Sequence, residues 1–204
     1  MVQKLKISNV SVKLYIFNLF LLFSITISAQ RYYTKTGITE FDGSKAAFEP
    51  IKAKNNSSIS AIDVSNGNIA ALIKIKDFEF RLGLMQEHFN ENYLESYKYP
   101  KSTFEGNIEI SSDSISDGNS KVFDYNLVDE NFRDIIIKGQ LTIKGVTKDF
   151  ITVGKIKKIK NVLNLISSFS IKLSDFNVKI PKVVFMKIDE IVKINLNYNY
   201  ELQN

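Results

Sequence analysis

The sequence predicts an all-β protein of antiparallel strands, and three observations lead to this prediction. Apolar and polar residues alternate along several segments, turn-forming residues separate these segments, and only one stretch has helical spacing. The alternation is clearest over residues 194–202, and residues 168–173 and 123–127 repeat it. Such alternation directs one face of a strand toward a core and the other toward water. Short strands at this spacing favour a closed barrel or a sandwich.

Three tetrapeptides predict tight turns between strands. Each contains a glycine and lies between two strand-like segments, so each is expected to close a hairpin. They are Ser65–Asn68, Ser116–Asn119 and Lys144–Thr147. Within residues 71–80 the apolar side chains change from odd to even positions near Lys76. A β-bulge and a simple break in the strand would both explain that change.

One stretch departs from the β pattern. Residues 83–96 have apolar side chains partly at helical spacing, which predicts a short helix or two helical turns. Tyr99 and Pro100 end this segment, because the residue before a proline favours extended geometry. A strand is expected to resume over residues 102–110.

Residues 1–29 are predicted to be a secretory signal peptide. Three lysines form a positive leader, an apolar run follows over residues 14–27, and the small residues Ser28 and Ala29 precede the expected cleavage site. A retained membrane-anchoring helix is the alternative. On the first interpretation, residues 30–204 form a single barrel domain, and the protein is exported to the periplasm or the extracellular space.

Composition argues against several classes of function. Three of the 27 basic residues and none of the acidic residues lie in positions 1–29, which leaves 24 basic and 22 acidic residues in the mature chain. This near balance predicts no nucleic-acid partner, because phosphate binding requires a concentrated basic surface. The sequence has no cysteine, so it can form neither disulfides nor an acyl-cysteine anchor. Four lysines within residues 155–160 form either a solvated strand edge or a patch for transient contact with anionic lipid head groups.

No motif in the sequence indicates catalysis or a bound metal or cofactor. There is no thiol, no nucleophile elbow and no phosphate-binding glycine loop, and His88 is the one histidine of the chain. Metal ligation would have to use oxygen ligands alone, and residues 113–119 lack the spacing of a calcium loop. We therefore expect a protein that is not an enzyme and that carries neither a metal nor a cofactor.

Two motifs together resemble those of the YceI-like family. Residues 85–106 (MQEHFNENYLESYKYPKSTFEG) are similar to its short helical insertion, and residues 138–148 (KGQLTIKGVTK) are similar to its hairpin. Residues 169–176 (FSIKLSDF) resemble its next-to-last strand more weakly, and residues 37–56 look compressed beside its long first strands. The resemblance implies an extended lipocalin-like barrel of eight antiparallel strands with a short helical insertion and a long apolar channel. In some members this channel holds a polyisoprenoid or a prenylated quinone.

Twelve residues are predicted to form the lipid-binding cap and channel wall. The motif of the helical insertion suggests the seven from Leu84 to Phe104. Alternation along strands adds the five from Phe123 to Tyr198, which are expected to face inward. Packing in a filled core remains the alternative for each of them. The twelve are Leu84, Met85, His88, Phe89, Tyr93, Leu94, Phe104, Phe123, Tyr125, Phe169, Ile171 and Tyr198.

The leading hypothesis is thus an exported carrier or store for an isoprenoid lipid, such as a polyisoprenoid or a prenylated quinone. A structural or protein-interaction barrel with a filled core is the alternative, because the chain has enough aromatic residues to close one. An enzyme acting on lipids through His88 is a third interpretation. These hypotheses differ on one physical property, namely whether the interior of the barrel is hollow.

Overall fold

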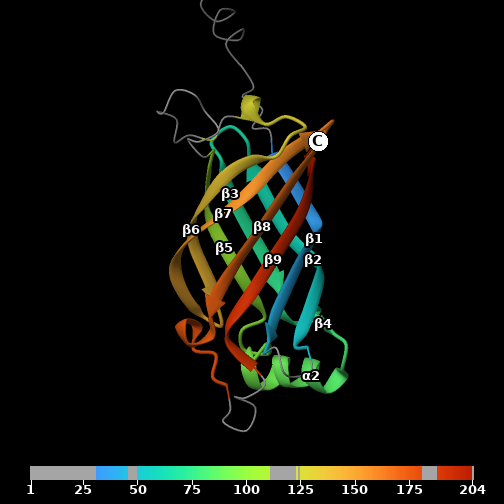
Figure 1. Ribbon diagram of the computed structural model, residues 1–204, viewed down its shortest axis with the longest axis vertical. Coiled ribbons are helices and arrows are strands. Elements are labelled where there is room, and N and C mark those ends of the chain that lie inside the picture. Colours follow the sequence, from blue (N-terminus) through green and yellow to red (C-terminus); the bar gives the residue numbers. More distant parts are fainter. Residues whose placement is uncertain (1–30, 46–49, 111–122, 124, 181–187, 204) are drawn as a thin grey trace, which may run out of the picture.

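Eight long strands form a closed antiparallel barrel in the computed structural model, which describes residues 31–45, 50–110, 123, 125–180 and 188–203 (Figure 1). The strands follow one another around the barrel in chain order, and β1 pairs with both β2 and β9, which closes it. Every pair of neighbours is antiparallel, and the predicted all-β barrel is confirmed. The strands are β1 (Arg31–Ser44), β2 (Lys52–Asp63), β3 (Asn68–Lys74), β5 (Lys101–Ile110), β6 (Arg133–Ile143), β7 (Val146–Ile159), β8 (Val162–Lys172) and β9 (Ile188–Leu202).

Two of the predicted turns lie where the sequence indicated. Gly67 has a φ of 76° in the turn between β2 and β3, and Lys144 and Gly145 have φ values of 48° and 75° between β6 and β7. In the β6–β7 turn, both central residues have positive φ, which matches the twist of the flanking strands. This turn therefore sets the register of β6 and β7. The third predicted turn, Ser116–Asn119, lies outside the described residues.

The change of alternation near Lys76 is a break in the strand. β3 ends at Lys74, a 3₁₀ turn η1 (Ile75–Asp77) follows, and the two-residue strand β4 (Glu79–Phe80) then pairs with β2. The turn redirects the chain so that Ile75 and Phe78 are both buried. Of the two explanations open from the sequence, the structure therefore has the strand break.

Two expectations from the sequence are wrong. Residues 125–127 form a 3₁₀ turn, η4 (Tyr125–Leu127), and are not part of a strand, because alternation over so few residues does not distinguish a strand from a turn. Residues 37–56 are also not compressed, since β1 has 14 residues and β2 has 12. Irregular register between β1 and β2 around Gly37 accommodates their sequence without shortening either strand.

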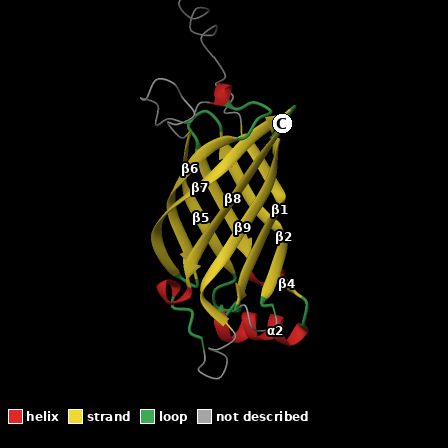
Figure 2. Ribbon diagram, in the orientation of Figure 1, coloured by secondary structure: helices red, strands yellow, loops and turns green. Residues whose placement is uncertain are grey.

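The predicted helical segment covers one end of the barrel. It consists of α2 (Gly83–His88) and the π-helical segment η2 (Phe89–Tyr93), and both lie across the bottom of the barrel in Figures 1 and 2. Backbone amides of Leu94 and Ser96 close its last turn on the carbonyls of Phe89 and Asn90. We call α2 and η2 together the cap. No helix among the described residues is long and apolar enough to cross a membrane.

The end of the barrel opposite the cap is filled by side chains. Tyr32, Ile62 and Leu163 are buried there, and Phe123 and Val128 cover them from the chain between β5 and β6. A second and smaller apolar cluster lies near the cap and includes Ile75, Leu94 and Phe176. The large cluster thus fills the end of the barrel opposite the cap, and only the smaller cluster lies near the cap.

The pairing between β7 and β8 covers only part of each strand. These strands pair only over Gly154–Ile159 and Val162–Ser167, although β7 begins at Val146 and β8 continues to Lys172. Beyond that point β7 pairs with β6 alone, and β8 pairs with β9 alone. We call this unpaired stretch the β7–β8 seam.

Candidate functional site

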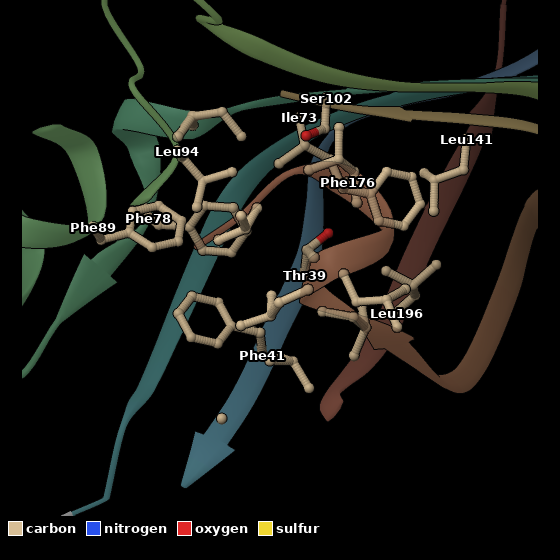
Figure 3. A pocket seen from close by; sticks show the side chains of 18 of the residues that line it. Thr39, Phe41, Ile73, Phe78, Phe89, Leu94, Ser102, Leu141, Phe176 and Leu196 are labelled. Carbon is tan, nitrogen blue, oxygen red and sulfur yellow. The ribbon is translucent and has the colours of Figure 1, made fainter. Parts of the chain in front are cut away.

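A cavity of about 480 Å³ occupies the cap half of the barrel (Figure 3). Strand residues that point inward form its wall, and residues of the cap form its base. Its volume falls within the range of about 300–1,000 Å³ that is common for pockets that enclose small organic ligands. The interior is therefore hollow at one end and filled at the other.

Four phenylalanine rings join the cap to the barrel. The Phe89 ring on the cap lies against those of Phe41, Phe78 and Phe80, with centroid distances of 5.3, 5.5 and 5.0 Å. Phe41 also contacts Phe78 and Phe80 directly. All four rings line the cavity, so this aromatic cluster both fixes the cap and forms part of the binding surface.

The wall of the cavity is apolar because the inward positions of the strands carry apolar residues. On β7, Phe150 and Thr152 line the cavity, whereas Ile151 and Val153 point outward and are 68% and 66% exposed. Phe150 bridges the β7–β8 seam from the inside, since its ring lies 4.8 Å from that of Phe169 on β8. The other apolar strand residues of the wall include Ile69, Ala71, Ile73, Phe104, Ile137, Leu141, Leu165, Ile171, Ile194 and Leu196.

Phe104 covers a place where two backbones approach closely. Gly106 and Gly139 are paired across β5 and β6, and the tip of the Phe104 ring lies over both of them. A Cβ atom at either glycine would overlap the backbone of the facing strand. The two glycines therefore let the ring lie flat against the wall, where it faces the cavity.

A chain of buried hydroxyls lies at the inner end of the cavity. The Thr39 hydroxyl is 2.8 Å from the Tyr198 hydroxyl and 2.9 Å from that of Ser58, and Ser58 donates to Asn55 Oδ1. Because the Ser58 proton is used for Asn55, Thr39 donates to Ser58 and Tyr198 donates to Thr39. Burial raises the pKa of Tyr198, although its hydroxyl partners partly oppose this. The tyrosine therefore stays neutral, and the chain presents only oxygen lone pairs.

The cavity has almost no charge. Among the side chains that line it, none is lysine, arginine, aspartate or glutamate, and His88 is the single histidine. His88 lies on the exposed cap, and no ion pair or hydrogen bond joins it to another described residue. No group of three or more potential metal-ligating side chains occurs among the described residues. The site is suited to holding an apolar molecule.

Ten of the twelve residues predicted from the sequence line this cavity. They are Leu84, Met85, His88, Phe89, Tyr93, Leu94, Phe104, Phe169, Ile171 and Tyr198.

Phe123 and Tyr125 do not line the cavity. The Tyr125 hydroxyl forms a hydrogen bond with that of Tyr32, and both Tyr125 and Phe123 pack on the solid end of the barrel. They lie there because their segment turns over the end of the barrel and does not run along its wall. Their position in the channel wall was therefore predicted wrongly.

Sequence reasoning missed much of the cavity. Phe41 lies on β1, and Phe78 and Phe80 flank or form the short strand β4, yet these rings complete the aromatic cluster. The shift from odd to even apolar positions near Lys76 was the signal for them, because it brings Phe78 and Phe80 toward the interior. Phe150 carried no such signal, because Ile151 and Val153 beside it are also apolar and yet point outward.

Family comparison agrees with this architecture. The profile of the YceI-like domain matches residues 23–200, which is most of the chain. The chain belongs to the YceI-like family. The resemblance found in the two sequence motifs is thereby confirmed, and it extends over the whole barrel. No curated protein matches the chain.

Solved structures of the YceI-like fold superpose on this barrel. A polyisoprenoid binding domain from Saccharophagus degradans, implicated in plant cell wall breakdown, is 12% identical with a TM-score of 0.65, and the match covers 85% of this chain and 98% of that one. BcnA from Burkholderia cenocepacia is 17% identical with a TM-score of 0.60, and the match covers 80% of this chain and 95% of that one. At these identities the comparisons establish the fold.

Proposed function

We propose that the protein is an exported carrier or store that holds an isoprenoid-type lipid in the cavity between barrel and cap. The observation that carries this proposal is the uncharged cavity of about 480 Å³, lined by inward-facing apolar side chains. The family supports it, and so does the polyisoprenoid binding domain from Saccharophagus degradans, which has the same fold. The proposed ligand is a polyisoprenoid or a prenylated quinone.

Burial of hydrocarbon is sufficient to hold such a ligand. Each methylene moved from water to an apolar surface contributes about 0.8 kcal/mol, which corresponds to roughly a fourfold change in Kd. The branched methyl groups of a prenyl chain fit between the aromatic and β-branched side chains of the wall, such as Ile73 and Phe104. No charged anchor is needed for affinity of this kind.

Binding without chemistry is part of the same proposal. His88 is exposed on the cap, and no carboxylate is hydrogen-bonded to it among the described residues, so nothing orients its ring as a general base would require. We infer that the cap residues contact the lipid and perform no reaction.

Export is proposed from the order of charge, apolar run and small residues within positions 1–29. A carrier in the periplasm or outside the cell would move a prenyl lipid through the aqueous phase, in which the free lipid is almost insoluble. The lysines of residues 155–160 would aid transient contact with an anionic membrane surface.

Organic extraction of the purified native protein, followed by mass spectrometry, tests this function. A prenyl lipid in stoichiometric amount is expected from the wild type. Ala71→Phe places a ring inside the cavity and should abolish the signal, whereas Ala70→Phe places the same ring on the outer face of β3 and should not. The function is refuted if the wild type yields no lipid and also fails to bind an added prenylated quinone.

A further inference from the structure

Ser102 is a buried residue of the cavity wall whose hydroxyl has no hydrogen-bond partner among the described residues. Ser102 on β5 is 8% exposed and lines the cavity beside Ile73, its paired residue on β3 (Figure 3). Its side chain forms no hydrogen bond with any described residue. The remaining buried serines of the strands differ, because Ser58, Ser60 and Ser167 donate to Asn55, to the Ala70 carbonyl and to the Val153 carbonyl.

The hydroxyl chain at the inner end cannot replace Ser102 as a donor. The hydroxyl protons of Tyr198 and Thr39 are both used within the chain that ends on Asn55. Tyr200 donates to Ser60 for the same reason, since the Ser60 proton goes to the Ala70 carbonyl. These groups offer lone pairs alone, whereas Ser102 offers a free proton as well.

The surroundings of Ser102 favour an uncharged partner. An ionised carboxylate would lose its hydration in this cavity, and no lysine or arginine lines the wall to compensate for it. A carbonyl or hydroxyl oxygen is less costly to bury and can accept the Ser102 proton. In an apolar cavity, a hydrogen bond of this kind favours ligands that have the matching group over those that lack it.

We propose that Ser102 is a specificity-determining residue, whose hydroxyl donates to a neutral carbonyl or hydroxyl oxygen on the bound lipid. The inference rests on the proposed function and deepens it, because it divides prenyl lipids by head group. Alcohols and quinones are accepted, pure hydrocarbons bind by their chains alone, and ionised acids are rejected.

Selection by head group is tested with three ligands that share the same prenyl chain length. They are the alcohol farnesol, the hydrocarbon farnesene and the carboxylic acid farnesoic acid. Dissociation constants are measured by isothermal titration calorimetry at neutral pH. The wild type is expected to bind farnesol about three- to tenfold more tightly than farnesene, which is the net effect of one hydrogen bond. Farnesoic acid is expected to bind more weakly than either.

Variants at Ser102 then test whether its hydroxyl causes the preference for farnesol over farnesene. Ser102→Ala should weaken farnesol binding about three- to tenfold and leave farnesene binding unchanged, whereas Ser102→Thr keeps a hydroxyl and should keep the preference. Ser170→Ala is the matched control, because Ser170 is exposed on the outer face of β8. A thermal melt of each variant shows whether it is folded.

The outcomes separate this inference from the proposed function. If all three ligands bind to the wild type with similar affinity, or if Ser102→Ala weakens farnesol and farnesene equally, the role of Ser102 is overturned and lipid binding stands. If none of the three ligands binds, the role of Ser102 is overturned, and the proposed function also fails when extraction yields no lipid and an added prenylated quinone does not bind. The comparison of ligands on the wild type needs no variant, so misfolding of Ser102→Ala cannot prevent a decision.

Discussion

Substitution of Phe89 by alanine should release the cap from the barrel. Phe89 makes three ring contacts, with Phe41, Phe78 and Phe80, and each aromatic pair contributes about 0.5–1.5 kcal/mol beyond the area it buries. Truncation of a buried phenylalanine typically costs about 3–5 kcal/mol, and Phe89 is only half-buried. The attachment of the cap is therefore expected to weaken by about 2–4 kcal/mol.

The kinetics of ligand release measure this loss. If the cap must open before the lipid leaves, 2–4 kcal/mol corresponds to release that is roughly 30- to 1,000-fold faster. A fluorescent prenyl lipid is loaded into the protein and mixed in a stopped-flow instrument with an excess of lipid vesicles. Denaturant unfolding of the same variant reports the stability of the whole barrel.

Leu84→Ala serves as the control for Phe89→Ala. Leu84 lies on α2 and lines the cavity, but it is 63% exposed and has no ring to add to the aromatic cluster, so its truncation should change the stability by less than about 0.5 kcal/mol. The reasoning is refuted if Phe89→Ala releases lipid within twofold of the wild-type rate. In that case the cap would not control release, whatever the loss of stability.

Three further predictions concern the barrel itself. Burial raises the pKa of Tyr32 to about 12 and also raises the pKa of Tyr198 and Tyr200. The unfolded chain therefore loses these protons first, and the free energy of unfolding should fall as pH rises above about 10, by up to roughly 1.4 kcal/mol per pH unit for each tyrosine. Denaturant titrations between about pH 8 and pH 12 check this, and a flat profile would contradict it. Gly139→Ala should destabilise or prevent folding, because its Cβ would overlap the Glu105 carbonyl, whereas Gly83→Ala meets nothing and should be neutral in a thermal melt. Hydrogen exchange measured by NMR should be faster for the β7 amides that face the seam than for those of Gly154–Ile159, and equal protection would argue that the strands are paired throughout.

The repeating parts of the fold were predictable from the sequence. Alternation over residues 194–202 identified β9, and the Lys144–Gly145 turn fixed the β6–β7 hairpin, because both depend on local backbone geometry. The cap was predictable for a related reason, since it interrupts the period of two with helical spacing.

The cavity itself was less predictable, because it depends on how distant segments meet. Phe123 lies in an alternating segment, yet it covers the solid end, whereas Phe150 lies in a largely apolar run and faces the cavity. The difference arises from the turn at residues 125–127, which carries the chain over the end of the barrel. Ser102 also could not be selected from the sequence, since only the structure shows that Ser58 and Ser60 have hydrogen-bond partners and that Ser102 has none within the part of the chain it describes.

The β7–β8 seam leaves one stretch of the barrel wall without a backbone ladder between neighbouring strands. Where neighbouring strands are paired, widening the wall would break backbone hydrogen bonds, each of which is costly to leave unmade. At the seam, the strands are joined by the contact of the Phe150 and Phe169 rings and, at its edge, by the Ser167 hydroxyl, which donates to the Val153 carbonyl. We therefore expect a thicker ligand chain to be accommodated by movement of the β6–β7 hairpin, while the filled end keeps the remaining strands in register.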